Sequence, residues 1–153
     1  MDRVAVALGS NVGDRRAHLD YAVSKLRIFL GNLTVSRYYD TVPVGVSGPQ
    51  SLFLNAVAVG ESTMSARALL EELLAIEQER GRERPYANAP RTLDLDLILF
   101  GDTVLDEPGL TVPHPRFRER RFVLEPLAEI APALVDPVSR RTIADLLLDL
   151  GAV

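Results

Sequence analysis

Two aspartates, Asp94 and Asp96, stand two residues apart in the otherwise apolar run 93–100. Successive side chains of a strand point to opposite faces, so a strand here puts both acids on one face with Ile98 and Phe100. The other face carries four leucines, Leu93, Leu95, Leu97 and Leu99. Two neighbouring carboxylates repel each other and lose solvation unless a cation or hydrogen-bond donors compensate. Carboxylate oxygens suit Mg²⁺, so the pair indicates a magnesium site. An edge strand with a solvated outer face is the alternative.

Arginines surround this pair of acids in the sequence. Residues 80–121 hold eight of the 17 basic side chains, all arginine, and Arg91 precedes Asp94 by three residues. Arg82 and Arg84 lie in the Pro- and Gly-containing segment that leads to Arg91. Guanidinium groups bind phosphate oxygens in pairs, and in a chain of net charge −4 a local arginine cluster favours a small anionic ligand over a long polyanion. A solvated run of charges is the alternative.

Three further polar side chains occur where apolar or exposed residues are usual. Asn55 interrupts the apolar run 52–61, and a buried amide suits either backbone groups or the edge of a heterocycle. Glu77 continues the apolar stripe of a helix that ends near Arg80 and opposes the helix dipole, so it faces a cation or a ligand unless the helix end frays. His114 lies between two prolines, which is typical of a rigid surface feature, but arginines and two phenylalanines follow it.

Composition restricts the classes of protein and of site. The 153 residues, 47% of them hydrophobic, indicate one domain over 1–153. With no cysteine and only two histidines, disulfides, thiolate nucleophiles, zinc–thiolate sites and His-rich metal sites are excluded, so any metal site is oxygen-based. No apolar stretch approaches the length of a membrane span and no signal peptide is evident, so we expect a cytoplasmic protein.

The elements that position these side chains follow a recognisable order. The patterns predict strands over 3–8, 33–41, 52–61 and 93–100, and helices capped by Asp14 to about residue 30 and by Thr63 or Ser65 to about residue 80. This order predicts an α+β, ferredoxin-like sandwich, an antiparallel sheet with helices on one face. A C-terminal loop and helical extension follows, with helices near 123–130 and after Thr142. Segments 43–51 and 82–90 are rich in Pro, Gly and polar residues, and we expect them to close over bound substrates.

At the level of motifs, the chain resembles the 6-hydroxymethyl-7,8-dihydropterin pyrophosphokinases of folate biosynthesis. The resemblance rests on five segments in the right order: Ala7-Leu8-Gly9-Ser10-Asn11, Phe53-Leu54-Asn55-Ala56, Ile76-Glu77 with Gly81-Arg82, Pro90-Arg91-Thr92-Leu93-Asp94-Leu95-Asp96, and Val112-Pro113-His114 with Arg120 and Phe122. They extend over nearly the whole chain, and the Pro-Arg-Thr-Leu-Asp-Leu-Asp string is highly specific.

The resemblance implies transfer of a pyrophosphoryl group from Mg·ATP to the hydroxymethyl group of the reduced pterin, with release of AMP. It implies that Asp94 and Asp96 hold two Mg²⁺ ions and act in catalysis with Arg82 and Arg91. The nucleotide-binding residues it implies are Glu77, Arg82, Arg84, Arg91, Leu97, Thr111, His114 and Arg120. The pterin-binding residues it implies are Thr41, Val44, Phe53, Asn55 and Phe122, with the two phenylalanines on either side of the ring and Asn55 at its edge.

Some positions depart from the usual family pattern, namely Asn88-Ala89 before the Pro-Arg, Gly109 in place of an arginine, Leu74 in place of a glutamine, and Phe53 in place of a tyrosine. These departures put lid kinetics and nucleotide affinity in question rather than the chemistry. Two other functions stay open, a ferredoxin-like binding module for RNA or a regulatory metabolite, and a metal-dependent phosphotransferase or nucleotidyltransferase acting on another alcohol. We expect a monomer whose partners are ATP and the pterin alcohol, with no nucleic acid and no membrane among them.

Overall fold

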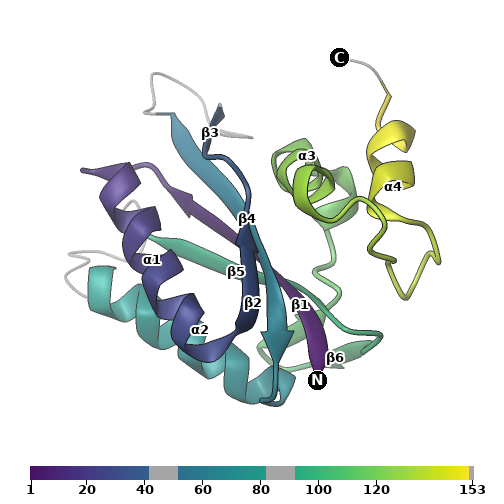
Figure 1. The fold of residues 1–153 in the computed structure, drawn as a ribbon, viewed down its shortest axis with the longest axis horizontal. Coiled ribbons are helices and arrows are strands. Elements are labelled where there is room, and N and C mark those ends of the chain that lie inside the picture. Colours follow the sequence, from purple (N-terminus) through teal and green to yellow (C-terminus); the bar gives the residue numbers. More distant parts are fainter. Residues whose placement is uncertain (42–51, 82–91, 152–153) are drawn as a thin grey trace.

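The computed structural model describes residues 1–41, 52–81 and 92–151 and contains a five-stranded antiparallel sheet between two layers of helices (Figure 1). Its strands are β1 (Asp2–Ser10), β2 (Gly31–Val35), β3 (Tyr39–Thr41), β4 (Phe53–Ser62) and β5 (Asp94–Phe100). The order is β2-β4-β1-β5, with β3 also paired to β4, and each paired set of strands is antiparallel. This topology confirms the predicted ferredoxin-like arrangement.

One face of the sheet is covered by α1 (Arg15–Phe29) and α2 (Ala66–Gly81). Even-numbered residues of β1 such as Val6 and Leu8 are buried against Leu26 of α1 and Leu73 of α2. Asp14 caps α1 as expected, because its carboxylate accepts from the backbone N–H of Ala17 at 3.1 Å.

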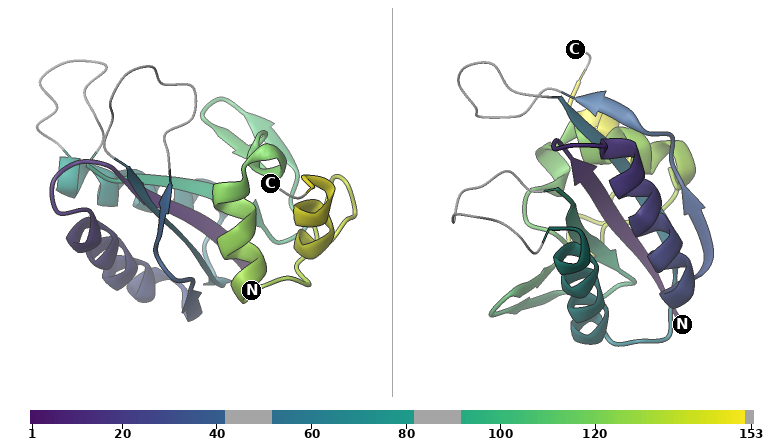
Figure 2. Two further views of the ribbon diagram at one scale, coloured as in Figure 1. Left: turned by 90° about the horizontal axis from the view of Figure 1, so that it is seen from above. Right: turned by 90° about the vertical axis from the view of Figure 1, so that its left-hand side faces the viewer.

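The other face of the sheet is covered by the C-terminal part of the chain (Figure 2). This layer consists of the short helix η1 (Phe117–Glu119), α3 (Arg121–Ile130) and α4 (Ile143–Asp149), whereas the β6–β7 hairpin (Leu105–Glu107 and Leu110–Val112) packs into the core of the first face and contacts Arg67 of α2. Phe117, Leu124 and Ile143 are fully buried against Val57 and Leu99 of the sheet. Helices therefore cover both faces of the sheet rather than one, and α3 and α4 leave the end of the second face near Gly9 for the cavity described below.

The predicted strand 33–41 is in fact two short strands that are offset by one residue. Val35 pairs with Ala58, whereas Tyr39 pairs with Asn55, so one extra residue lies between them. Ser36 occupies the break, where its hydroxyl accepts from the backbone N–H of Val57 at 3.0 Å. A continuous strand over 33–41 would put Val35 and Tyr39 on one face, but the offset leaves Val35 with the core of the first face and turns Tyr39 toward Glu129 of α3.

A β-bulge also interrupts the strand that carries the two aspartates. Leu97 pairs with Val6 and Leu99 with Ala5, which leaves Ile98 without a partner in β1. The carbonyl of Ile98 accepts instead from the backbone N–H of His114 at 2.9 Å. The predicted alternation is correct from Leu93 to Leu97 and wrong beyond the bulge, where Leu99 packs under α3 and Phe100 under α1 and α2.

The segments 43–51 and 82–90, which we expect to close over substrates, lie outside the described residues. Within the described ranges, no helix is long and apolar enough to cross a membrane.

Candidate active site

A cavity of about 790 Å³ opens on the second face of the sheet, between the ends of β1, β4 and β5 and the segment that contains η1 and the start of α3. The helical layer on this face packs on Val57, Val59 and Leu99. It leaves the neighbouring ends of β1, β4 and β5 uncovered, and the cavity lies there. The cavity brings together residues that are far apart in the sequence, from Ala7 to Glu125.

The floor of the cavity is built from cross-strand rows. Gly9 of β1 pairs with Asn55 on one side and with Asp94 on the other, and Ala7 pairs with Asp96 in the next row. On this face of the sheet the central strand carries the small residues Ala7 and Gly9, so the side chains of both neighbouring strands face one open space. A Cβ atom added to Gly9 would lie 3.0 Å from Nδ2 of Asn55. Gly9 is thus required for the close approach of the Asn55 amide.

Aromatic and amide side chains line the β4 end of the cavity. Phe53 and Phe122 line it from the sheet and from α3, and Asn55 is 8% exposed. The hydroxyl of Thr41 donates to Oδ1 of Asn55, which fixes the orientation of the amide. No described residue accepts from Nδ2 of Asn55, so this group can donate to a ligand. One amide atom of Asn55 therefore has a protein partner, which is a side chain rather than a backbone group, and contact of the other amide atom with a heterocycle stays a prediction.

The β5 end of the cavity carries the acid pair. Asp94 and Asp96 are both half-buried, both line the cavity, and both have further contacts within the protein. Between them, the backbone N–H of Leu95 donates to Oε2 of Glu77 at 2.7 Å, so Glu77 ties α2 to this strand. Among the described residues no group of three or more acidic or histidine side chains is assembled, and two carboxylates are the donor set that suits Mg²⁺ bound to substrate phosphates.

His114 lies beside this acidic end. Burial, and then the charges of Arg120 and Arg116, lower the pKa of His114 below its ordinary value, while Asp94 acts in the opposite direction. The ring is therefore neutral near pH 7. Its Nδ1 accepts from the backbone N–H of Arg116 at 3.2 Å, so Nε2 carries the hydrogen and can donate to an anion.

Not every expected residue lines the cavity. Leu97 is buried in the core under α1 and α2, and Thr111 is exposed on β7, where its hydroxyl donates to Asp106 at 3.2 Å. Glu77 holds the backbone of β5 rather than fraying into solvent. The roles of these three residues toward a nucleotide stay predictions. The expected residues Val44, Arg82, Arg84 and Arg91 lie outside the described part of the chain.

Two departures from the family pattern can be placed. Gly109 has a φ of +77° in the turn between β6 and β7, a conformation that an arginine would adopt only with strain. Leu74 is 47% exposed on α2. Asn88 and Ala89 lie outside the described residues.

Seven of the lining residues were not among the expected site residues. These are Ala7, Leu8 and Gly9 of β1, and Arg116, Glu119, Arg121 and Glu125 on the opposite wall. Gly9 was part of a family motif, and its place in β1 rather than in a turn shows why a residue without a side chain is required there. Arg121 and Glu125 pair with each other at 2.9 Å, and their four-residue spacing on a helix could have indicated this pair.

Known proteins are similar to this chain in both sequence and fold. The family model of 7,8-dihydro-6-hydroxymethylpterin-pyrophosphokinase matches residues 5–132. A protein of Synechocystis sp. called 2-amino-4-hydroxy-6-hydroxymethyldihydropteridine pyrophosphokinase is 43% identical over 145 residues, which are 93% of this chain and 73% of that protein. A protein of the same name from Pseudomonas aeruginosa is 41% identical over 145 residues, with 92% of this chain and 87% of that protein covered.

Among solved structures, the wild-type HPPK-DHPS of Plasmodium falciparum matches 97% of this chain with a TM-score of 0.77 at 15% identity. The match covers 44% of that longer chain, and at this identity it supports the fold alone. The extent of the family match and the identity to the two bacterial proteins decide the assignment. The chain belongs to the 7,8-dihydro-6-hydroxymethylpterin-pyrophosphokinase family.

Proposed function

We propose that the protein is an ATP-dependent diphosphotransferase of folate biosynthesis, which converts 6-hydroxymethyl-7,8-dihydropterin and ATP into the pterin diphosphate and AMP. The observation that carries this proposal is the division of one cavity into two ends, with Asn55 and the two phenylalanines at one end and the acid pair at the other. A flat heterocycle with a hydroxymethyl arm, bound at the first end, can present its hydroxyl to a triphosphate at the second.

The pterin is held by Asn55, Thr41, Phe53 and Phe122. Nδ2 of Asn55 donates to an acceptor on the edge of the ring, and the Thr41 hydroxyl keeps the amide in that orientation. The aromatic side chains cover the faces of the ring, a contact that contributes about 0.5–1.5 kcal/mol beyond area burial for a well-placed pair. Backbone groups near Val44 complete the pterin site.

The triphosphate is held at the β5 end by Nε2–H of His114 and the guanidinium group of Arg120, with Arg82, Arg84 and Arg91 from the neighbouring segment. Asp94 and Asp96 hold two Mg²⁺ ions, which supply charge neutralisation for the phosphates when they are bound. Glu77 keeps both carboxylates in place because it binds the backbone between them. Leu97 and Thr111 lie nearer the nucleoside.

The reaction forms one bond to the β-phosphorus and breaks one, and the attacking hydroxyl group loses its proton. The hydroxymethyl oxygen bonds to the β-phosphorus, the bond from the β-phosphorus to the oxygen bridging to the α-phosphorus breaks, and that oxygen leaves with AMP. The hydroxyl proton is released. Such transfers depend mainly on positioning and charge stabilisation, which agrees with a site rich in fixed acids and arginines.

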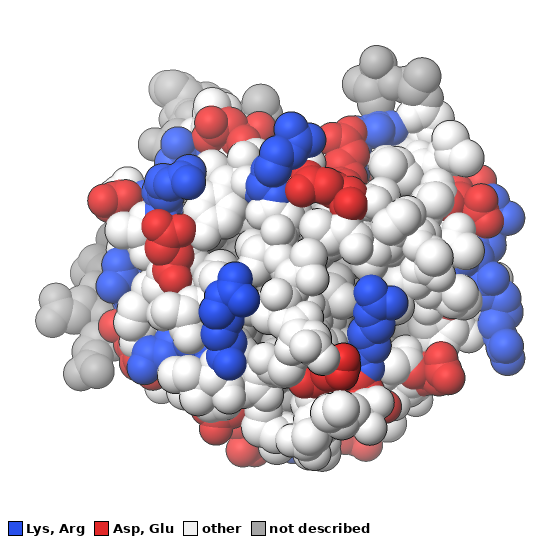
Figure 3. All heavy atoms as spheres, in the orientation of Figure 1, with Lys and Arg blue, Asp and Glu red and all other residues white. Residues whose placement is uncertain are grey.

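We also propose that the protein acts as a monomeric single domain in the cytoplasm, without a nucleic-acid partner. Basic and acidic groups are interspersed on the face in Figure 3, and they form no continuous basic track among the described residues there. A binding module for single-stranded RNA would instead present exposed aromatic groups on a basic sheet, and the open end of this sheet carries two acids.

Incubation with ATP, Mg²⁺ and the reduced pterin alcohol, followed by mass analysis of both products, tests the proposal. We expect AMP together with a pterin that has gained two phosphates. Formation of ADP and a singly phosphorylated pterin, or of a nucleotidyl pterin, would support the alternative transferases and overturn pyrophosphoryl transfer.

A further inference from the structure

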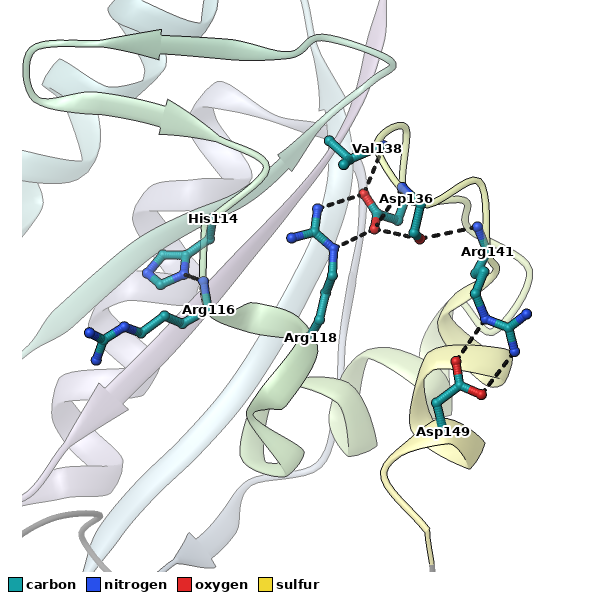
Figure 4. Close-up of polar contacts among 8 residues, drawn as sticks. His114, Arg116, Arg118, Asp136, Val138, Arg141 and Asp149 are labelled. Carbon is teal, nitrogen blue, oxygen red and sulfur yellow. Dashed lines mark hydrogen bonds and ion pairs between the residues drawn. The ribbon is translucent and has the colours of Figure 1, made fainter.

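Arg116 lies on the wall of the cavity, and the proposed function assigns no ligand to its guanidinium group. Its side chain is exposed, it lines the cavity together with Asp94 and Arg120, and its charge contributes to the lowered pKa of His114. Figure 4 shows the Arg116 side chain and the His114 ring next to each other, both directed away from Asp136.

The fold fixes this direction through the short helix that follows. Phe117 of η1 is fully buried, and Arg118 makes two hydrogen bonds to the buried carboxylate of Asp136, at 2.5 and 2.9 Å. Arg118 therefore points toward Asp136 and does not line the cavity, whereas the Arg116 side chain points in another direction (Figure 4). With η1 held on that side, Arg116 before it and Arg120 after it are left on the cavity side.

The three arginines on the cavity wall differ in their partners. The guanidinium of Arg121 is occupied, since it pairs with Glu125 at 2.9 Å and donates to the carbonyl of Gly151. The guanidinium of Arg120 lies 5.6 Å from the centre of the Phe122 ring. Neither Arg116 nor Arg120 forms a side-chain hydrogen bond or ion pair with any described residue. Two guanidinium groups that form no hydrogen bond or ion pair within the described part of the chain, next to a neutral histidine that can donate, form an anion-binding wall.

We propose that Arg116 is a phosphate-binding residue of this site, whose guanidinium contacts the polyphosphate chain of the nucleotide alongside Arg120. This inference rests on the proposed function, because it names a further residue for the same triphosphate. A planar guanidinium binds two phosphate oxygens at once, which a lysine at this position cannot do. The contact gives Arg116 a role in nucleotide affinity and none in pterin affinity, because the pterin lies at the β4 end.

The variants Arg116→Ala and Arg116→Lys test the inference, with Arg3→Ala as the matched control. Arg3 is an exposed arginine near the start of β1, at the opposite end of the strand from Gly9. Calorimetry measures the Kd of a non-hydrolysable ATP analogue with Mg²⁺, and steady-state kinetics give KM for ATP and for the pterin. Competition by inorganic tripolyphosphate reports the phosphate contacts without the nucleoside.

We expect Arg116→Ala to raise the Kd of the analogue and the inhibition constant of tripolyphosphate by about tenfold each, the size of effect that loss of one charge-assisted contact gives. KM for the pterin and the melting temperature stay at the wild-type values. Arg116→Lys recovers part of the loss, and Arg3→Ala matches the wild type.

Two results would overturn the inference. One is an unchanged affinity of Arg116→Ala for both the analogue and tripolyphosphate, while the wild type binds both. The other is an equal loss of pterin and nucleotide affinity with a lower melting temperature, which would identify a structural role. If the wild-type protein neither binds the analogue nor turns over, the proposed function itself fails, so the two failures are distinguishable.

Discussion

Substitution of Gly9 by alanine should weaken pterin binding and leave the free energy of unfolding nearly unchanged. The new Cβ atom would lie 3.0 Å from Nδ2 of Asn55 and 3.8 Å from Cδ1 of Phe53. Asn55 cannot move away freely, because the Thr41 hydroxyl donates to the other atom of its amide. The substitution therefore misaligns the group that binds the edge of the pterin and adds a methyl group to the floor of the cavity.

The magnitude follows from these two effects. Loss of a well-aligned hydrogen bond to the pterin costs about 1 kcal/mol, and crowding of the bound ring costs about 1 kcal/mol more. Together they correspond to a rise in KM for the pterin of roughly thirtyfold. The free energy of unfolding should change by less than about 1 kcal/mol, because the tight contact offsets the lower chain entropy of the unfolded alanine variant.

Steady-state kinetics with varied pterin, together with thermal unfolding, measure both quantities. Gly31→Ala is the matched control, since it is another strand glycine whose added Cβ would meet only a carbonyl oxygen at 4.0 Å. An unchanged KM for the pterin in Gly9→Ala would refute the placement of the pterin on Gly9 and Asn55.

Three further predictions concern the charged groups and the coupling between substrates. Asp94→Asn and Asp96→Asn should each lower kcat at least a hundredfold at saturating Mg²⁺ while the melting temperature shifts by less than about 4 °C; near-normal kcat would contradict the metal assignment. Burial raises the pKa of Asp136, but hydrogen bonds from Arg118 and Ser139 outweigh burial and lower this pKa to about 2. The contribution of Asp136 to the free energy of unfolding is therefore fully present above about pH 4 and decreases as the pH drops toward 2. Acid unfolding should reveal a loss of about 2 kcal/mol over this range, absent from Asp136→Asn. A non-hydrolysable ATP analogue with Mg²⁺ should tighten pterin binding several-fold, and the pterin should tighten the analogue by the same factor, whereas calorimetry without coupling would contradict a shared site.

Much of the fold could be predicted because local patterns and tertiary packing agree. The strand predicted over 52–61 is observed as β4, which pairs with β1 along its whole length and keeps Phe53, Asn55, Val57 and Val59 on one face. The cap at Asp14 depends on residues that are close in sequence, so the pattern alone locates it.

The two strand irregularities could not be predicted, because each depends on a contact with a distant segment. The bulge at Ile98 is satisfied by the backbone of His114, and the break at Ser36 by the backbone of Val57. Neither contact leaves a pattern in the local sequence. A one-residue offset reverses the face of each residue that follows, which explains the position of Tyr39 and the wrong face predicted for Phe100.

Site residues could be predicted where their type is chemically unusual for their place in the sequence. Residues that belong to the site only because of their position in the fold were missed. The acids Asp94 and Asp96 were identifiable because charge is costly on an apolar strand. Arg116 was one of several arginines in a row, and only the anchoring of Arg118 by Asp136 distinguishes which of them face the cavity.

In the proposed reaction, one cavity holds both substrates so that the pterin oxygen attacks the β-phosphorus of ATP. ATP that carries a heavy oxygen isotope at the bridge between the α- and β-phosphorus tests it most directly. After turnover with the reduced pterin alcohol, we expect the heavy oxygen in AMP and none in the pterin diphosphate, by mass spectrometry of both products. Heavy oxygen retained in ADP, or found in the pterin product, would contradict this reaction.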